Sequence, residues 1–368
     1  AGTTLLKDIN TNTSGGAHNL VVMGNTIYFI ARSGLTGDGG DLWKSDGTVA
    51  GTVLVKDLTP GLEAGVPFGP LVAAGNTLYF QANDSASGRE LWKSDGTAAG
   101  TVLVKDINPG VGHGLRFGPL TAVGGIVYFQ ADDGASGNEL WKSDGTTAGT
   151  VLVKDINPGV AGGFSYGALT AIGSTLYFQA HDGSQDGWGL WKSDGTTAGT
   201  VLVKSIVIDN NNYPGAIIVI DSTLYFAAHD SVQGYGLWKS DGTEAGTLMV
   251  KGGKTNGFYA GGFTAVGGTF YFGANDGIHG AELWKSDGTE AGTMLVKDIN
   301  PGAGGSNVEG LAVIGNTLHF QANDNARGRE LWKSDGTAGG TVLVKDINPG
   351  VGDSSFNFIS LVVGSTLY

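Results

Sequence analysis

Short apolar runs alternate with turn residues along the whole chain, and the runs have the length of β-strands. In residues 70–118 these runs are Pro70–Ala74, Leu78–Ala82, Glu90–Lys93 and Thr101–Asp106. The segments between them are rich in Gly, Asn, Asp and Ser, which favour turns. No stretch of useful length shows the helical spacing of apolar positions. The pattern predicts four short antiparallel strands in each unit of this kind.

The four-run unit recurs along the chain, and each copy is marked by the sequence Leu-Trp-Lys-Ser-Asp-Gly-Thr, which we call the tryptophan motif. Its first copy is Leu42–Thr48, and successive copies begin 46 to 50 residues apart. The marker tryptophans are Trp43, Trp92, Trp141, Trp191, Trp238, Trp284 and Trp332. A repeat of this length with four strands predicts an all-β fold, a β-propeller in which each unit is one blade.

The two ends of the chain carry incomplete units. Residues 1–9 match a fourth run without its first three, and residues 361–368 match a first run and part of a second. We therefore expect eight blades of about four strands, with a composite blade closed by both termini; seven blades is the alternative. Closure of this kind removes exposed sheet edges. The expected domain is a single propeller, 1–368, with repeats at approximately 1–49, 50–98, 99–147, 148–197, 198–244, 245–290, 291–338 and 339–368, the last of them partial.

Composition narrows the classes of partner. The chain has 66 glycines without a collagen-like period, 15% charged residues and a net charge of −13. An acidic balance argues against nucleic acid and against anionic membrane surfaces, both of which attract clustered Lys and Arg. No apolar run approaches the roughly 20 residues of a spanning helix, so we expect no membrane insertion. There is no cysteine, and hence no disulfide framework.

The tryptophan motif itself is expected to serve folding. Its Ser-Asp-Gly-Thr portion lies between the third and fourth runs, where Asp and Gly are preferred turn formers. In content and position this turn resembles the Asp-box hairpins of sialidase-type propellers, which are structural. A large aromatic residue on a strand is expected in the core, so we place the marker tryptophans between neighbouring blades.

The complete pattern, as at Glu90–Ile107, resembles the ELWxxDGT repeat family over essentially the whole chain. The resemblance implies a large secreted or surface-attached bacterial protein, and the family as such carries no defined activity. The expected location is therefore secreted or cell-surface, with any export signal removed or outside this chain. Local departures from the pattern include Gly189 and Gly236 in place of the Glu.

The loop between the second and third runs carries an Asp, a Gly and a Glu in four of the units. Carboxylates and nearby carbonyls are the oxygen ligands that Ca²⁺ requires, although the spacing is not that of an EF-hand. An Asx-type turn, with the Glu capping backbone or pairing with Lys, accounts for the pattern without metal. Both interpretations are kept, and no other cofactor is expected. The candidate metal ligands are Asp84, Glu90, Asp133, Glu139, Asp276, Glu282, Asp324 and Glu330.

The fourth and fifth units depart from this pattern together, because an aromatic residue stands just before the lost Glu in each. Aromatic rings flanked by Asn, Asp and His are a composition typical of sugar-binding sites. Drift on an exposed rim is the alternative. The candidate ligand-binding residues are Trp188, Tyr235, His181, Asp182, His229, Asp230, Tyr213 and Asn211.

Catalysis finds little support, and no catalytic residue is assigned. The sequence has no nucleophile elbow, no His-Glu-x-x-His and no phosphate-binding loop. A glycosidase needs one carboxylate pair at a defined separation, whereas these pairs recur in most units. We expect a non-enzymatic extracellular or cell-surface propeller that serves as a structural, adhesive or assembly module, with a lectin as the alternative. The expected partners are an extracellular protein or glycan, self-assembly, or attachment within a larger polypeptide.

Overall fold

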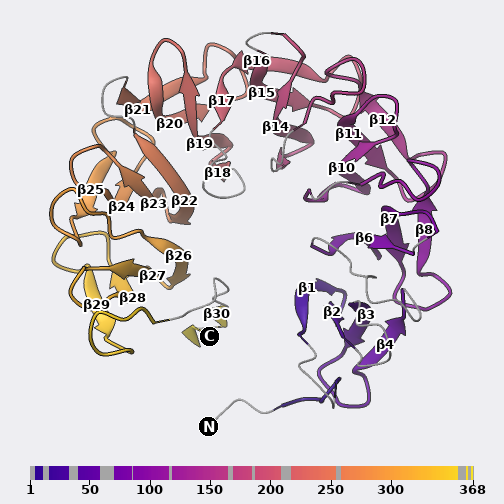
Figure 1. Ribbon diagram of the computed structural model, residues 1–368, viewed down its shortest axis with the longest axis horizontal. Coiled ribbons are helices and arrows are strands. Elements are labelled where there is room, and N and C mark those ends of the chain that lie inside the picture. Colours follow the sequence, from indigo (N-terminus) through magenta and orange to yellow (C-terminus); the bar gives the residue numbers. More distant parts are fainter. Residues whose placement is uncertain are drawn as a thin grey trace. The chain divides into compact units, whose positions relative to one another are not determined.

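The computed structural model is built of β-strands that form antiparallel sheets in chain order (Figure 1). It describes residues 5–10, 16–32, 40–58, 70–84, 86–115, 118–164, 169–184, 187–208, 217–253, 258–354, 362–363 and 366–367. None of these residues is helical, so no helix among them is long and apolar enough to cross a membrane. The chain divides into two compact units, Ala1–Val201 and Leu202–Tyr368.

The N-terminal unit contains the first three sheets and most of the fourth, each with four strands in sequence order. Blades one to three are β1 (His18–Met23), β2 (Thr26–Ala31), β3 (Asp41–Ser45), β4 (Val53–Lys56); β5 (Val72–Ala74), β6 (Thr77–Asn83), β7 (Arg89–Ser94), β8 (Val102–Lys105); and β9 (Thr121–Val123), β10 (Ile126–Asp132), β11 (Asn138–Ser143), β12 (Val151–Lys154). Blade four is β13 (Thr170–Ile172), β14 (Thr175–His181), β15 (Trp188–Ser193) and β16 (Val201–Ser205). Neighbouring first strands, such as β1 and β5, contact each other, so they line the inner side of this row of sheets.

The C-terminal unit repeats the arrangement with one addition. In blade five both β17 (Val207–Ile208) and β18 (Ile218–Ile220) pair with the same strand, β19, and this makes the sheet five-stranded. The remaining strands of blade five are β19 (Thr223–Asp230), β20 (Gly234–Ser240) and β21 (Leu248–Gly253). Blade six is β22 (Tyr259–Val266), β23 (Thr269–Asn275), β24 (Ala281–Ser286) and β25 (Met294–Lys297), and blade seven is β26 (Glu309–Ile314), β27 (Thr317–Asn323), β28 (Arg329–Ser334) and β29 (Val342–Lys345). A final pair consists of β30 (Val362–Val363) and β31 (Thr366–Leu367).

The predicted all-β propeller is confirmed, and its described residues form seven complete blades, the number that the sequence left as the alternative. The expected eighth, composite sheet is not formed among them, because residues 5–10 make no strand and β30 pairs only with β31. Residues 5–10 nevertheless make one hydrogen bond that is typical of the fourth strands in the complete blades. Lys7 donates to the carbonyl of Thr52 at 2.6 Å, as the fourth-strand lysines of complete blades do to the next blade.

The core lies between the faces of successive blades. The second strand β6 is buried along its middle on both faces, since one blade packs on each side. Phe80 and Trp92 of blade two share a buried cluster with Tyr28 and Leu42 of blade one. The predicted position of the marker tryptophans between blades is therefore confirmed here.

Lysine side chains connect each blade to the next. The Lys56 Nζ of blade one lies 5.7 Å from the centre of the Trp92 ring and donates to the Thr101 carbonyl at 2.7 Å. A cation over an aromatic face is worth about 0.5 to 2 kcal/mol, more as the pair is desolvated. The equivalent pairs are Lys105–Trp141, Lys154–Trp191, Lys204–Trp238, Lys251–Trp284 and Lys297–Trp332.

The Ser-Asp-Gly-Thr hairpin is closed by its own side chains. In blade two the Ser94 and Thr101 hydroxyls lie 2.7 Å apart, and the Gly96 N–H donates to Ser94 Oγ at 3.0 Å. Asp95 Oδ1 accepts from both the hydroxyl and the N–H of Thr97, at 2.7 and 2.9 Å. The Thr97 hydroxyl bond in particular holds the pKa of Asp95 below its ordinary value. The side chains of the tryptophan motif thus stabilise the fold, as the sequence predicted.

Candidate functional site

The acidic residues at the start of the second-to-third loops form turns. Asp84 Oδ1 accepts the N–H groups of Ala86 and Ser87 at 3.0 and 2.8 Å. Such bonds from a side chain to the backbone two and three residues ahead are those of an Asx-type turn. Asp133, Asp276 and Asp324 accept the corresponding pairs of N–H groups in their own loops.

The glutamate of the same loops holds the connection to the next blade. Glu90 is fully buried, and its carboxylate accepts the N–H groups of Ile107, Asn108 and Gly114 at 3.0, 3.4 and 2.8 Å. Both ends of the segment 108–114 are therefore fastened to one carboxylate, which we call the glutamate clamp. Its equivalents are Glu139 with Ile156 and Asn157, Glu282 with Ile299, Asn300 and Ser306, and Glu330 with Ile347, Asn348 and Ser354.

The candidate calcium ligands are therefore engaged with the protein's own groups. In each loop the Asp oxygen accepts N–H groups of the turn, whereas the Glu oxygens accept N–H groups of the next connection. In the part of the chain that the structure describes, no three His, Asp or Glu side chains gather closely enough to hold a metal ion. The Asx turn with a backbone-capping Glu is the arrangement present.

Burial gives the clamp an unusual protonation equilibrium. Desolvation raises the pKa of both Glu90 and Glu139 to about 7, although the backbone N–H bonds act in the opposite direction. The carboxylate of Asp106 raises the pKa of Glu90 further. Burial raises the pKa of Glu282 as well, against the bond from the Ser306 hydroxyl. Glu90 and Glu139 therefore take up protons near neutral pH.

The stability of the protein is expected to fall as pH rises from about 4.5 to about 7. In this window the folded clamp binds protons that the unfolded chain, with a Glu pKa of 4.5, has released, so protonation favours the folded state. Below it stability falls again, because the hairpin carboxylates such as Asp95 have lowered pKa values and lose their bonds when protonated. Urea midpoints measured from pH 3.5 to 8 check this shape.

The matched control for this pH profile is the double variant Glu90→Gln and Glu139→Gln, which cannot titrate at the clamp. The urea midpoint of this variant should fall less steeply between about pH 4.5 and 7 than that of the wild type. Its fall below about pH 4.5 should stay unchanged. A wild-type midpoint that rises across this window contradicts the prediction.

The candidate sugar-binding residues form one aromatic pair in each of two blades. In blade four His181 and Trp188 lie opposite each other on β14 and β15, with ring centres 5.1 Å apart in an edge-on arrangement. His181 Nδ1 accepts the Gly183 N–H at 2.9 Å, and Asp182 Oδ1 accepts the Ser184 N–H at 3.0 Å. The bond from the Ser184 side chain lowers the pKa of Asp182.

Blade five carries the second pair, in the other unit of the chain. His229 and Tyr235 lie opposite each other on β19 and β20, with ring centres 4.4 Å apart. The backbone of Asp230 pairs with Gly234. Tyr213 and Asn211 lie outside the described residues. The structure thus shows two cross-strand aromatic pairs, each of which stabilises its own hairpin.

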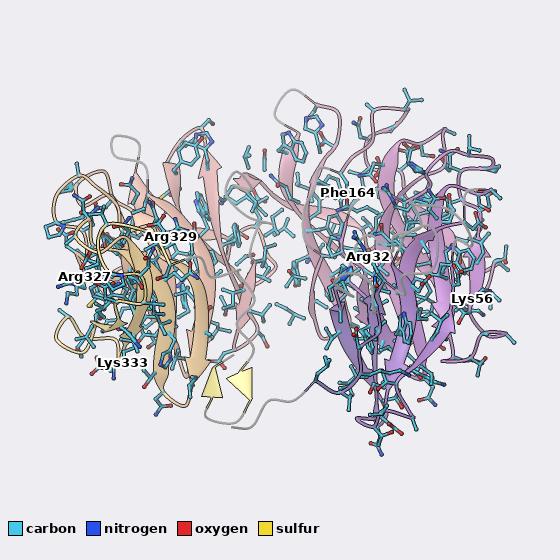
Figure 2. The ribbon with its side chains drawn as sticks, turned by 60° about the horizontal axis from the view of Figure 1, so that its bottom comes forward. Arg32, Lys56, Phe164, Arg327, Arg329 and Lys333 are labelled. Carbon is cyan, nitrogen blue, oxygen red and sulfur yellow. The ribbon has the colours of Figure 1, made fainter. Side chains whose placement is uncertain are left out.

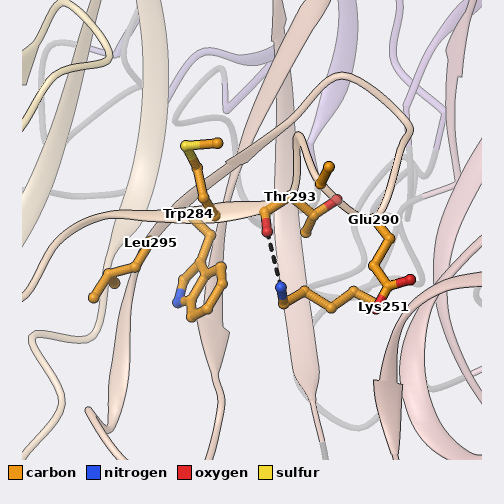
Figure 3. Close-up of a pocket in the computed structure, with 7 residues that line it drawn as sticks. Lys251, Trp284, Glu290, Thr293 and Leu295 are labelled. Atoms are coloured by element: carbon orange, nitrogen blue, oxygen red, sulfur yellow. Dashed lines mark hydrogen bonds between the residues drawn. The ribbon is translucent and has the colours of Figure 1, made fainter.

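An open groove runs along the seam between blades five and six (Figure 3). Its volume is about 630 Å³, and its lining includes Trp284, Glu290, Met294 and Leu295. Lys251 also lines it, but this lysine donates to the Thr293 carbonyl at 3.0 Å and lies 5.7 Å from the centre of the Trp284 ring. The groove therefore lies at the outer end of the contact between blades five and six. The ammonium group of Lys251 is already engaged in holding these two blades together.

One surface feature escaped the sequence analysis. Val111, Val160 and Val351 follow Asn-Pro-Gly in three connections, and each is 80 or 81% exposed. We call them the loop-tip valines. Single exposed aliphatic residues are ordinary, but these three occupy one position of the repeat. In the sequence, these valines could have been found from the recurrence of Asn-Pro-Gly-Val at 108–111, 157–160 and 348–351.

The loop-tip valines stand on loops that are closed at their base. In addition to the glutamate clamp, Asn157 Nδ2 donates to the Gly162 carbonyl at 2.8 Å, and Asn348 Nδ2 donates to the Asp353 carbonyl at 3.1 Å. These bonds span the connections that carry Val160 and Val351. Their exposure therefore belongs to an ordered loop, which holds an apolar side chain in water.

Comparison with known proteins gives a fold and no family. No family model and no curated protein matches the chain. Among solved structures it is similar to puromycin hydrolase, at 15% identity over 94% of this chain and 55% of that one, with a TM-score of 0.43. A structure from an analysis of two prolyl endopeptidases matches at 12% identity over 89% of this chain and 48% of that one, with a TM-score of 0.51. BamB from Moraxella catarrhalis matches at 13% identity over 97% of this chain and 93% of that one, with a TM-score of 0.52.

These likenesses support the propeller fold with about seven blades, and they correct the functional expectation. The chain spans about half the length of the two peptide-cleaving or hydrolytic enzymes that it resembles. The sequence predicted a non-enzymatic extracellular or cell-surface structural, adhesive or assembly module, with a lectin as the alternative. The solved structures with a TM-score above 0.5 are a prolyl endopeptidase and BamB, so they correct the expectation of an adhesive or sugar-binding propeller. The matched part makes up about half of the prolyl endopeptidase structure and nearly the whole of BamB.

Proposed function

We propose that this propeller is the docking domain for a second protein domain that carries a reaction, and that the two loop-tip valines of the N-terminal unit, Val111 and Val160, make the docking contacts. The observation that carries the proposal is the exposure of Val111 and Val160 on clamped loops of one unit. The propeller itself contributes binding and orientation, and the reaction belongs to the partner domain.

Energetics favours a protein partner for these side chains. Burial of a fully exposed valine yields about 1.5 kcal/mol or more. Because the glutamate clamp and the Asn157 bond already order the loops, little conformational freedom is lost when a partner covers Val160. A preformed loop with an apolar tip suits an apolar recess on another protein better than it suits a sugar or an ion.

The partner class follows from the enzymes that share the fold. For the prolyl endopeptidases, inter-domain dynamics has a role in catalysis and specificity. That protein is about twice as long as the segment matched here, since the match covers 48% of it. We extend this relation to the present chain as part of the proposal, with a hydrolase domain as the partner class.

Co-purification tests the proposal. The full chain is expected to retain a hydrolase in constant stoichiometry, and replacement of Val111 and Val160 by lysine should reduce the retained amount at least about tenfold. The matched control replaces Val102 and Val151 of the same unit, each 37% exposed at the start of a fourth strand, by lysine. The control should retain the partner.

Two outcomes contradict the proposed function. One is equal loss of the hydrolase in both double variants, since that shows a general effect of added charge. The other is turnover of peptide or ester substrates by the purified chain alone, because the reaction would then belong to the propeller.

A further inference from the structure

The seam between blades five and six lacks a hydrogen bond that closes the corresponding seam elsewhere. The Thr147 hydroxyl of blade three donates to the Val104 carbonyl of blade two at 2.8 Å, and blade four repeats this bond to blade three. In blade six the same position of the hairpin is Glu290. Because an ionised carboxylate only accepts hydrogen bonds, the Val250 carbonyl of blade five receives none from this side chain.

This exchange of residues places a carboxylate at the groove of this seam. Glu290 lines the groove together with Met294 and Leu295, and the side chain of Met294 is 43% exposed. The Nζ of Lys251 is turned toward the Thr293 carbonyl, as the dashed line in Figure 3 marks. The groove therefore presents apolar side chains beside a carboxylate, while the nearby ammonium group is already bound.

Two carboxylates elsewhere in this unit are paired with arginines of the chain itself. Arg329 donates to Glu309, and Arg327 donates to Asp324; both arginines are labelled in Figure 2. Among the residues that the structure describes, Glu290 has no ion-pair partner. A guanidinium group makes charge-assisted bonds to a carboxylate through several N–H groups. The carboxylate of Glu290 therefore favours an arginine from outside the chain.

The turn that carries Glu290 is already ordered. The Thr293 N–H donates to the Glu290 carbonyl at 3.2 Å, and the Gly292 N–H donates to the Thr289 hydroxyl at 2.9 Å. The Thr293 hydroxyl donates to the Thr289 carbonyl at 2.6 Å. Little backbone freedom is therefore lost when a ligand binds to this turn.

We propose that this groove of the C-terminal unit binds an arginine that is flanked by apolar residues on an exposed segment of another protein. The guanidinium group donates to the Glu290 carboxylate and to the Val250 carbonyl, and the apolar neighbours of the arginine cover Met294 and Leu295. A protein segment fits better than a free cation, which would leave these two apolar side chains in water. The inference is independent of the loop-tip valines, which lie in the connections between blades and not at this groove.

NMR of the methionine methyl groups tests the inference on the full chain, which has only three methionines, Met23, Met249 and Met294. The chain, labelled with carbon-13 at these methyl groups, is titrated with the peptide acetyl-Gly-Leu-Arg-Leu-Gly-amide. The Met294 signal should shift saturably, whereas the signal of Met23, which packs between blades one and two, should stay in place. The same peptide with citrulline in place of arginine keeps the size and loses the charge, so it should bind at least about fivefold more weakly.

Two variants with the same change of net charge separate this site from a general attraction of cations to an acidic protein. Glu290→Gln should raise the dissociation constant measured at Met294 at least about fivefold. The matched control, Glu244→Gln, changes the same position of the hairpin in blade five and should leave the Met294 titration unchanged. Both glutamates are exposed, so both variants should remain folded.

Four outcomes overturn the proposal. The first is the absence of a saturable shift at Met294. The second is equal weakening by Glu290→Gln and Glu244→Gln, because binding would then follow net charge alone. The third is equal binding of the arginine and citrulline peptides. The fourth is a shift of Met294 by free arginine at the same concentrations as by the peptide, because the groove would then bind a small cation and not a protein segment.

Discussion

Replacement of Glu90 by alanine is expected to destabilise the protein by about 2 to 5 kcal/mol, although no catalytic or ligand contact is lost. The fully buried carboxylate accepts three backbone N–H groups, from Ile107, Asn108 and Gly114. Each buried donor left without an acceptor costs about 1 to 3 kcal/mol, and the bond to Asn108 is the longest and weakest of the three. Urea denaturation at pH 6, followed by the midpoint and slope, measures the loss.

Two variants distinguish the stability that the glutamate clamp contributes from that of the loop that contains it. Glu90→Gln keeps one acceptor oxygen and the side-chain volume, so its destabilisation should be smaller than that of Glu90→Ala. Asp84→Ala removes the turn bonds to Ala86 and Ser87 in an exposed loop, and we expect a loss of about 1 kcal/mol. If Glu90→Ala costs no more than Asp84→Ala, the clamp does not order the connection.

The regular part of this fold could be predicted because its determinants are local. A hairpin such as Ser94–Thr101 is closed by side chains within a few residues of each other, so the turn residues alone indicate it. The position of Trp92 between blades follows from its size and its place on a strand. Period, strand number and hairpin chemistry agree with one another, and that agreement is why the blades were predictable.

The candidate sites were harder to predict because they depend on contacts far apart in the sequence. Glu90 and Asp84 share a loop and carry the charge of a metal site, yet each is committed to different backbone groups, the farthest of them 24 residues away. His181 and Trp188 have a sugar-binding composition, but their register places them as cross-strand neighbours. Sequence composition indicates chemistry, whereas the hydrogen bonds decide whether that chemistry is available.

Exposure was the property least accessible from the sequence. Val104 and Val344 occupy the same position of the repeat, in the identical context Thr-Val-Leu-Val-Lys-Asp-Ile, and are 4% and 45% exposed. Blade three packs on Val104, whereas Val344 lies in the last complete blade that the structure describes. The loop-tip valines show the converse, since their exposure depends on the clamp that closes the loop beneath them. In neither example can the exposed fraction of the valine be predicted from the residues next to it in the sequence.

Alanine at Gly96 is expected to destabilise the protein by about 2 to 5 kcal/mol, and alanine at Gly47 by only about 1 to 2 kcal/mol. The two glycines lie in identical Ser-Asp-Gly-Thr hairpins with φ angles of 87° and 88°, so the cost of the left-handed backbone is the same for both. At Gly47 an added Cβ meets no atom within 4 Å. At Gly96 it would lie 2.2 Å from the hydroxyl oxygen of Tyr28 and 3.0 Å from its ring carbon, in the preceding blade.

The difference between the two variants therefore measures the blade-to-blade contact apart from the turn. Tyr28 is buried, so its ring can yield only by disturbing its neighbours Leu42 and Phe80. Tyr28→Phe removes the hydroxyl and should recover part of the loss in the Gly96→Ala background while leaving Gly47→Ala unaffected, a coupling that a double-mutant cycle isolates. Equal losses at Gly96 and Gly47 would mean that the blades separate freely enough to absorb a methyl group. The close packing at this contact would then not determine how tightly successive blades are held together.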